Sequence, residues 1–453
     1  MKKRETFSNR SAAIMAMAGS AIGLGNIWRF PYMVGENGGA AYIILYLCAT
    51  VFLSLPIFLA ESILGRRTQL GTYGAMQTLA PGTGWRNMGF LTLSSALIIL
   101  SFYSVVGGWS CDYFLQSLAL GFSHDRIEDI PLMFSRLASH PWQPIVCHTV
   151  FLLLTALIVA FGVKKGIERF STITLPLLFI LILIIIAYSL SLPGSFKGVT
   201  YLIKPDFSKM GPSTVVAAMG QSFFSLSLGV GTILTYSSHI DKKEHLLGSG
   251  LGTALADILF AILAGFAIMP AVFSAGIEPG SGPGLIFETL PYIFAQIGEH
   301  TPVLSAIIAI LFFLAIVVAA LTSSISLLET GVSYLVEEKG IRRWTAVLIL
   351  FALTWVVGCL CSLSFGPLQD VHLFGCTIFD FCDKLTANFM MTLGGFLFTF
   401  FVGWKMSKAD VRDELTSGGE DRLAVRCFGV LYFLIRYIAP LVIITIFITN
   451  LVL

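Results

Sequence analysis

Long apolar runs alternate with short polar segments along the whole chain of 453 residues. Most runs contain about 20 residues, which is enough for a helix to cross a hydrocarbon layer ~30 Å thick. We therefore predict eleven membrane-spanning helices, numbered here as spans one to eleven. They lie near residues 11–34, 41–65, 87–121, 143–162, 167–192, 212–239, 246–274, 302–337, 342–364, 374–404 and 426–451.

The composition agrees with a polytopic membrane protein. Hydrophobic residues make up 56% of the chain and charged residues only 12%, about half of the ~25% found in soluble domains. A formal net charge of +2 gives no reason to expect a nucleic-acid partner. The chain has no Walker-type phosphate loop, GxSxG or HExxH motif, so we expect neither an enzyme nor an ATP-driven pump.

The distribution of Lys and Arg predicts an orientation in the membrane. If the N-terminus is cytoplasmic, the inner segments contain 20 of these residues and the outer loops contain 5. Cytoplasmic loops carry the excess of positive charge in membrane proteins. We therefore expect a plasma (cytoplasmic) membrane protein with its N-terminus inside and, after eleven crossings, its C-terminus outside.

Span one contains residues that interrupt a helix. The stretch AGSAIGLGNIWRFP covers residues 18–31 and combines three glycines with Asn26 and Arg29. Gly19 and Gly23 alone form a GxxxG pattern, which close helix packing would explain. The added polar residues favour an unwound segment instead. Such a segment must line a cavity or be covered by protein, because lipid cannot satisfy its backbone groups.

Span six contains a second interruption, in GQSFFSLSLGVGTILTY at residues 220–236. Its centre holds Ser225, Ser227, Gly229 and Gly231. Spans one and six each begin a block of five helices, and by the count of crossings they run in opposite directions. Two broken helices in matching positions of inverted repeats indicate a secondary transporter with its binding site at the breaks.

Four motifs are specific enough to compare with a known family: GSAIGLGNIWRFPYMVGENGGAAYIILY, FFSLSLGVGTILTY, GPGLIFETLP and ALTSSISLLE. They resemble the neurotransmitter:sodium symporters, in particular the eleven-helix bacterial amino-acid transporters. The resemblance implies an all-α leucine-transporter fold and two bound sodium ions. It implies one domain, 1–453, with repeat one at about 11–192, repeat two at about 212–404 and an extra helix at about 426–451.

The resemblance implies two sodium sites built from uncharged oxygens and one carboxylate. Site one comprises Ala21, Asn26, Ser225 and Asp257, and site two comprises Gly19, Ile22, Ala319, Thr322 and Ser323. From spacing alone, Ala319, Thr322 and Ser323 share one helix face. Small residues at a helix interface would also explain that pattern.

Asp257 distinguishes this chain from many relatives, which have Asn at the matching position. A carboxylate at mid-membrane depth is costly and is functional by default, although a structural salt bridge stays an alternative. Its charge replaces the one that chloride supplies in chloride-coupled relatives, and Ala261 one turn further on has no hydroxyl to assist chloride. We therefore predict no chloride requirement.

The resemblance implies a substrate site between the two breaks. It comprises Ala21, Gly23, Leu24, Gly25, Ile99, Tyr103, Phe224, Ser225, Ser227, Val230, Ser323 and Leu327. In monoamine-transporting relatives an Asp replaces Gly23, so its absence here favours a free amino acid. The resemblance implies that Val230 stands where the leucine-type member of the family has a Phe, so we expect a larger pocket here. A larger apolar pocket predicts hydrophobic substrates, including aromatic ones such as tryptophan. Apolar pockets discriminate weakly, by ~1–3 kcal/mol per methylene.

The resemblance also implies gates on both sides. The outer pair is Arg29 with Asp383, and the inner pair is Arg4 with Glu337. Either pair is alternatively a surface contact worth under ~1 kcal/mol. Two residues near the inner pair differ from the family pattern, because Phe7 replaces a Trp and His239 replaces a Tyr.

Two further features agree with the prediction of locally unwound helices. The resemblance implies that Glu61 accepts hydrogen bonds from unwound backbone, whereas a snorkelling acid is the alternative. Gly166 and Pro176 match a G-x9-P spacing in span five, where the family unwinds locally. A proline alone would indicate an ordinary kink.

The sequence therefore predicts a sodium-coupled symporter that imports hydrophobic L-amino acids by alternating access through a lipid bilayer. A sodium-dependent amino-acid sensor of the same fold, with little transport, is the alternative. A twelfth helix that is common in the family is missing, and no oligomeric state is predicted.

Overall fold

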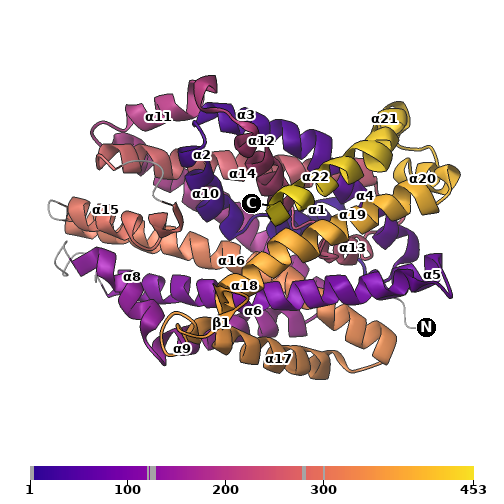
Figure 1. Cartoon of the computed structure of the whole chain (residues 1–453), viewed down its shortest axis with the longest axis horizontal. Helices are drawn as coiled ribbons and strands as arrows, with labels where there is room; N and C mark the ends of the chain where they lie inside the picture. The colour runs from indigo at the N-terminus through magenta and orange to yellow at the C-terminus, as the bar shows by residue number, and fades with distance from the viewer. Residues whose placement is uncertain (1–4, 120–121, 123–128, 278–281, 299–300, 453) are drawn as a thin grey trace.

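The computed structural model describes residues 5–119, 122, 129–277, 282–298 and 301–452. Nearly all of this chain is helical, as the long apolar runs predict (Figure 1). In the described part, nine helices are long and apolar enough to cross a membrane, or ten when the bent pair in span one counts as one crossing. The two helices of span six, with 14 and 6 residues, are each too short to qualify. The structure is therefore compatible with eleven crossings.

The first five spans form the predicted repeat one. Their elements are α1 (Arg10–Ala21), η1 (Gly25–Arg29) and α2 (Phe30–Glu36) in span one; α3 (Ala40–Ala49), η2 (Thr50–Ser54) and α4 (Leu55–Thr68) in span two; η3 (Gly84–Arg86) and α6 (Asn87–Leu118) in span three; α9 (Gln143–Ala160) in span four; and η5 (Val163–Glu168) and α10 (Arg169–Ser191) in span five.

The next five spans form the predicted repeat two, followed by span eleven. Their elements are α12 (Pro212–Ser225) and α13 (Thr232–Ser237) in span six; α14 (Leu246–Ser274) in span seven; α16 (Pro302–Lys339) in span eight; α17 (Arg343–Leu363) in span nine; α18 (Ile378–Lys384), η8 (Leu385–Met390), α19 (Met391–Phe400) and η9 (Phe401–Lys405) in span ten; and α21 (Arg422–Phe433), η10 (Leu434–Ile438) and α22 (Ala439–Val452) in span eleven. The division into repeats stays a prediction.

Short elements connect the spans. They are α5 (Thr72–Leu79), α8 (Ile130–Ser139), α11 (Phe196–Ile203), η6 (Phe207–Lys209), η7 (Gly282–Leu285), α15 (Thr289–Gly298), α20 (Lys408–Leu415), and the strands β1 (His372–Leu373) and β2 (Cys376–Thr377), which pair antiparallel. The hairpin corrects the predicted start of span ten. Its helix begins at Ile378 instead of residue 374, because Phe374 and Gly375 turn the chain with positive φ angles of 52° and 81°.

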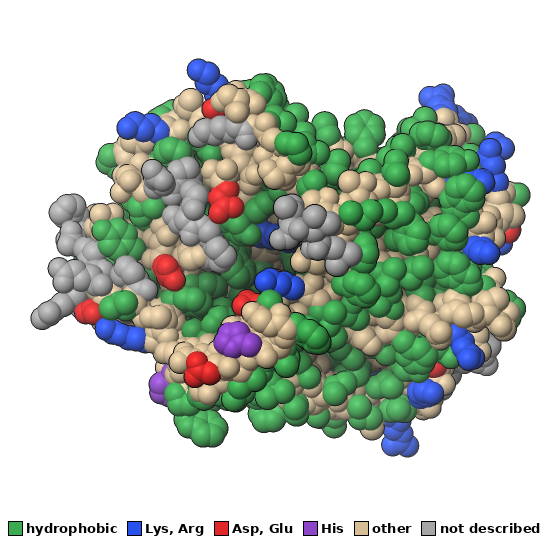
Figure 2. Space-filling view, in the orientation of Figure 1, with side chains coloured by type: hydrophobic (Ala, Val, Ile, Leu, Met, Phe, Trp, Pro, Cys, Tyr) green, Lys and Arg blue, Asp and Glu red, His purple; other side chains and the backbone are tan. Residues whose placement is uncertain are grey.

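The surface has the pattern of a protein that crosses a bilayer. Figure 2 shows hydrophobic side chains over the middle of this face, with many Lys and Arg side chains toward the end where Figure 1 places the N-terminus and α20. Large apolar side chains stay exposed on the outer faces of the spans; Ile173, Ile180 and Leu183 of α10 are 60%, 56% and 52% exposed. In water such faces would aggregate, whereas lipid covers them.

Polar contacts attach the short helix α20 to the end of span two. Arg66 is buried and its Nε lies 2.6 Å from Glu414 Oε1. Asp410 accepts a hydrogen bond from the Ser407 hydroxyl at 2.7 Å and pairs with Arg67 at 2.6 Å. These contacts lower the pKa of the Asp410 carboxyl, the Ser407 hydrogen bond most strongly. The connection between spans ten and eleven is therefore fixed to span two.

Candidate functional site

The break in span one lies between α1 and η1. α1 ends at Ala21, Ile22 is extended with φ −73° and ψ 107°, and a π-helical turn begins at Gly25. The helices on either side are bent by 56°. Backbone carbonyls freed by the break accept hydrogen bonds from other spans; Ser227 Oγ donates to the Ser20 carbonyl at 3.0 Å.

The break in span six is longer and has a different backbone. α12 ends at Ser225 and α13 begins at Thr232. Ser227, Gly229 and Gly231 have φ angles of 53°, 81° and 75°, a region that glycine adopts without steric cost. Glu61 lies beside this break, and its Oε1 accepts a hydrogen bond from the Gly229 N–H at 2.7 Å. The predicted position of Glu61 against unwound backbone is thus present in the structure.

A cavity lies between the two breaks. All twelve residues of the predicted substrate site line it, together with Met391 of span ten: Ala21, Gly23, Leu24, Gly25, Ile99, Tyr103, Phe224, Ser225, Ser227, Val230, Ser323, Leu327 and Met391. Met391 was not predicted, because a methionine within an apolar span carries no signal that separates a cavity wall from packing. Its binding role, like that of the other residues, stays a prediction.

One end of the cavity is polar and narrow. The Leu24 N–H donates a hydrogen bond to the Tyr103 hydroxyl at 3.2 Å. A Cβ atom at Gly23 would lie 2.3 Å from Ser323 Oγ and 2.9 Å from the Tyr103 hydroxyl. Any larger residue at position 23 would therefore displace Ser323 or Tyr103 and change the shape of this end of the cavity.

Three of the four residues predicted for sodium site one, Asn26, Ser225 and Asp257, contact one another around the fully buried Asp257, and the fourth, Ala21, lines the cavity together with Ser225. Asn26 Nδ2 donates to Asp257 Oδ1 at 2.8 Å, and Ser225 Oγ donates to the two carboxylate oxygens at 2.8 and 2.9 Å. Tyr46, which the sequence reading missed, donates to Asp257 Oδ2 at 2.9 Å. A hydroxyl within an otherwise apolar part of span two was the available signal.

The residues predicted for sodium site two also converge. The Ile22 carbonyl accepts hydrogen bonds from Thr322 Oγ1 at 3.2 Å and from Ser323 Oγ at 3.3 Å. Both hydroxyls also reach the Ala319 carbonyl, at 2.8 and 3.5 Å. Gly19 packs at the same place, since a Cβ there would lie 3.5 Å from Thr322 Cβ. Uncharged oxygens in one cluster are a donor set that suits a hard monovalent cation.

The predicted outer gate is not an ion pair in this structure. Among the described residues no contact within 4.0 Å joins Arg29 to Asp383. The Arg29 guanidinium instead lies over the Phe224 ring, 5.1 Å from its centroid. The outer gate therefore stays a prediction about another conformation.

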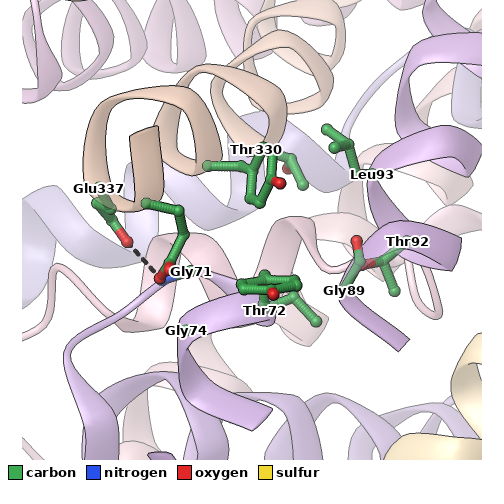
Figure 3. Close-up of a pocket in the computed structure, with 11 residues that line it drawn as sticks. Gly71, Thr72, Gly74, Gly89, Thr92, Leu93, Thr330 and Glu337 are labelled. Atoms are coloured by element: carbon green, nitrogen blue, oxygen red, sulfur yellow. Dashed lines mark hydrogen bonds between the residues drawn. The ribbon is translucent and has the colours of Figure 1, made fainter. Parts of the chain in front are cut away.

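On the inner side, Arg4 lies outside the described residues. Glu337 accepts a hydrogen bond from the Gly71 N–H at 2.9 Å, in a small cavity between α5, α6 and the end of α16 (Figure 3). The nearby N-terminal segment is attached to the end of span six, because the Phe7 N–H donates to the His239 carbonyl at 2.9 Å. Phe7 is buried there and packs edge-on against Tyr236.

Of the two positions predicted to loosen span five, one lies in an irregular turn and the other in regular helix. Gly166 belongs to the π-helical turn η5, and Pro176 lies inside α10. A Cβ at Gly166 would lie 2.0 Å from the Ile158 carbonyl oxygen, so this turn packs directly on the backbone of span four.

Comparison with known proteins agrees with this geometry. The model of the sodium:neurotransmitter symporter family matches residues 4–130 and 122–453. The sodium-dependent transporter YhdH of Bacillus subtilis is 38% identical over 98% of this chain and 97% of its own. A sodium-dependent transporter of Haemophilus influenzae is 34% identical over 99% of both.

A solved structure gives the same result. The crystal structure of MhsT in complex with L-phenylalanine has a TM-score of 0.89 and 38% sequence identity, and the match covers 99% of this chain and 100% of that one. The predicted leucine-transporter fold class is therefore confirmed. The expectation of a transporter instead of an enzyme is confirmed as well, because the family and these sodium-dependent relatives are transporters.

Proposed function

The chain belongs to the sodium:neurotransmitter symporter family, and we propose that this sodium-dependent symporter imports hydrophobic L-amino acids, aromatic ones included. The observation that carries the proposal is the cavity between the two breaks, next to the two oxygen clusters around Asp257 and the Ile22 carbonyl. Alternating access then moves the substrate, as spans one, two, six and seven rock as a bundle against the rest.

The ends of the cavity support an amino acid as substrate. Near Tyr103 the cavity offers a hydroxyl and the unwound backbone of Leu24 and Gly25, where a carboxylate is favourable beside the N-terminus of η1. Gly23 leaves no room for the acidic side chain that would hold a monoamine. The substrate carboxylate would then lie next to sodium site one and couple the ion to the amino acid.

The rest of the wall supports a hydrophobic side chain. Ile99, Phe224, Val230, Leu327 and Met391 line it, and Val230 is only 1% exposed. MhsT, the similar protein of known structure, was crystallised with L-phenylalanine. Because apolar walls discriminate weakly, we propose several hydrophobic substrates instead of a single one.

Two sodium ions per substrate would give the transport its driving force. Two sodium ions and a zwitterion carry two net charges, worth about 4.6 kcal/mol at 100 mV. At 1.4 kcal/mol per tenfold, this supports about 10³-fold accumulation. Asp257 supplies a negative charge inside site one, so we propose that no chloride is needed.

The proposed orientation places the N-terminus in the cytoplasm and the C-terminus outside, in the cytoplasmic membrane. The excess of Lys and Arg in the proposed inner segments supports it. When the outer gate is closed, Arg29 would pair with Asp383. When the inner gate is closed, Arg4 would pair with Glu337.

The test is uptake of radiolabelled L-phenylalanine into proteoliposomes with sodium outside. Accumulation above the external concentration is expected with sodium and not with potassium, and it should be unchanged when gluconate replaces chloride. Saturable sodium-dependent binding without accumulation would favour the sensor. Failure to bind phenylalanine, tryptophan or leucine would contradict the proposed substrate class.

A further inference from the structure

Two buried thiols face each other where span nine meets span ten. Cys361, near the end of α17, and Cys382, in α18, have their Sγ atoms 3.8 Å apart. Both cysteines are unbridged, and they are 0% and 8% exposed. The hairpin β1–β2 joins the two helices, so the thiols meet across a turn of the chain.

Neighbouring contacts hold the two helices in this alignment. The Phe379 N–H at the start of α18 donates a hydrogen bond to Ser364 Oγ at the end of α17, at 3.3 Å. The rings of Phe379 and Phe365 pack edge to face with centroids 5.0 Å apart. A disulfide requires the two sulfurs to move from 3.8 Å to about 2.0 Å apart.

The position of Cys382 ties this pair to the transport path. Asp383, the proposed outer gate residue, is its neighbour in sequence, and span ten continues through the π-helical turn η8 to Met391 in the substrate cavity. Asp383 and Arg29 form no ion pair among the described residues, so closing the gate requires α18 and span one to approach each other.

We propose that Cys361 and Cys382 form a reversible disulfide that locks α18 onto α17 and slows closure of the outer gate. The site itself rests on the thiol geometry, whereas its effect on transport rests on the proposed function. In the proposed orientation the pair lies near the outer surface, where disulfides persist in oxidising compartments.

The oxidant is a disulfide compound, either small or carried by a protein. The Cys382 thiolate, the more exposed of the two, attacks one oxidant sulfur and releases the other as a thiol. The Cys361 thiolate then attacks the Cys382 sulfur and releases the second oxidant thiol. Two electrons pass from the cysteine pair to the oxidant, and the two cysteine protons end on its two thiols.

Two other cysteines serve as matched controls. Cys359 lies on α17 two residues before Cys361, and Cys376 lies in β2, where its Sγ is 3.4 Å from Lys384 Nζ. Among the described residues, the sulfur that lies within 4.0 Å of the Cys361 sulfur as a hydrogen-bond partner is that of Cys382 and not that of either control. Their replacement by serine should therefore leave the proposed disulfide intact.

The experiment uses the full chain in proteoliposomes treated from outside with oxidised glutathione. Non-reducing peptide mapping by mass spectrometry should find a Cys361–Cys382 linked peptide in the wild type, in Cys359→Ser and in Cys376→Ser. The linked peptide should be absent from Cys382→Ser. If Cys382→Ser fails to fold, Cys361→Ser provides the same test. Initial phenylalanine uptake should fall at least fivefold on oxidation and recover with dithiothreitol, and Cys382→Ser should not respond.

Each outcome decides one part of the inference. Absence of the linked peptide would overturn the site. A linked peptide with unchanged uptake, or with unchanged amide hydrogen exchange in α18, would overturn the lock. A reduced protein that never transports would defeat the proposed function alone, because peptide mapping and hydrogen exchange still test the disulfide and the lock.

Discussion

The two broken helices look alike in sequence, but they need their glycines for different physical reasons. In span one no described residue of the break has a positive φ, and Gly23 is needed because a Cβ would enter the space beside Ser323 and Tyr103. In span six, Gly229 and Gly231 have φ angles of 81° and 75°, so the backbone conformation itself demands glycine. Glycine in one break keeps space open in the cavity, and glycine in the other allows the backbone conformation.

Their surroundings differ in the same way. Both breaks line the cavity, but Gly23 of span one faces side-chain hydroxyls, whereas Gly229 of span six packs on backbone. A Cβ at Gly229 would lie 2.0 Å from the Met391 carbonyl oxygen, and a Cβ at Gly394 would lie 2.0 Å from the Gly229 carbonyl oxygen. We therefore expect substitutions in span six to affect folding first and substitutions in span one to affect binding first.

The largest effect is expected from Gly229→Ala. The new methyl group would meet the backbone of span ten while the residue keeps an unfavourable φ, which alone costs about 1–3 kcal/mol. We therefore expect folded protein to be lost or its Tm to fall by several degrees. Gly220→Ala in α12 is the control, since nothing lies within 4 Å of a Cβ there. Thermal unfolding in detergent measures both, and equal Tm values would contradict the distinction.

A smaller loss of stability is expected at Glu61. Replacement by Leu leaves the Gly229 N–H without its acceptor in a buried place, which costs about 1–3 kcal/mol. Glu61→Gln keeps a carbonyl oxygen that accepts the same hydrogen bond, so its Tm should lie between those of Glu61→Leu and the wild type. If the Gln and Leu variants have the same Tm, Glu61 does not brace the break.

Gly23→Ala should separate binding from folding. The atoms that its methyl group meets belong to the side chains of Ser323 and Tyr103 and not to backbone, so these side chains can shift and the Tm should fall less than in Gly229→Ala. The Kd for phenylalanine should rise at least tenfold, because the methyl group occupies the polar end of the cavity. A fall in Tm as large as that of Gly229→Ala would remove the contrast between the breaks.

The smallest effect is expected from Met391→Ala, which enlarges the cavity on the span-ten side. Loss of apolar contact should raise the Kd for phenylalanine about threefold to tenfold, and the Kd for the larger tryptophan should rise less. Met390→Ala is the matched control, because its side chain is buried but does not line the cavity. Equal shifts in both variants would indicate a general packing effect.

Most of the fold followed from the sequence, because apolar runs of span length and two interrupted helices are strong local signals. The predictions were less successful where contacts between segments that are distant in sequence decide the structure. The hairpin before Ile378 interrupts an apolar run that periodicity assigned to helix. The short connecting helices α5, α11 and α15 are set by packing and lie below the length of a span.

The site divides in the same manner. Residues in long family motifs, such as Asn26 and Ser225, were placed by resemblance, and the structure brings them to the two breaks. Tyr46 and Met391 were missed, since each reaches the site from a span whose sequence reads as ordinary apolar helix. The Arg29–Asp383 pair was expected, but an ion pair between moving helices depends on the conformational state.

Sodium titration of phenylalanine binding tests the central claim, that the unwound segments bind the ion and the substrate together. Equilibrium binding to purified wild-type protein should rise with sodium. Asn26→Ala should need at least tenfold more sodium, measured below the Tm of the variant, because the Gly23 N–H and Asp257 lose a buried hydrogen-bond partner and the Tm itself should fall. Asn87→Ala, at an exposed position in α6, is the control and should bind like the wild type. Binding that is independent of sodium, or equally sodium-dependent in Asn26→Ala, would contradict the account.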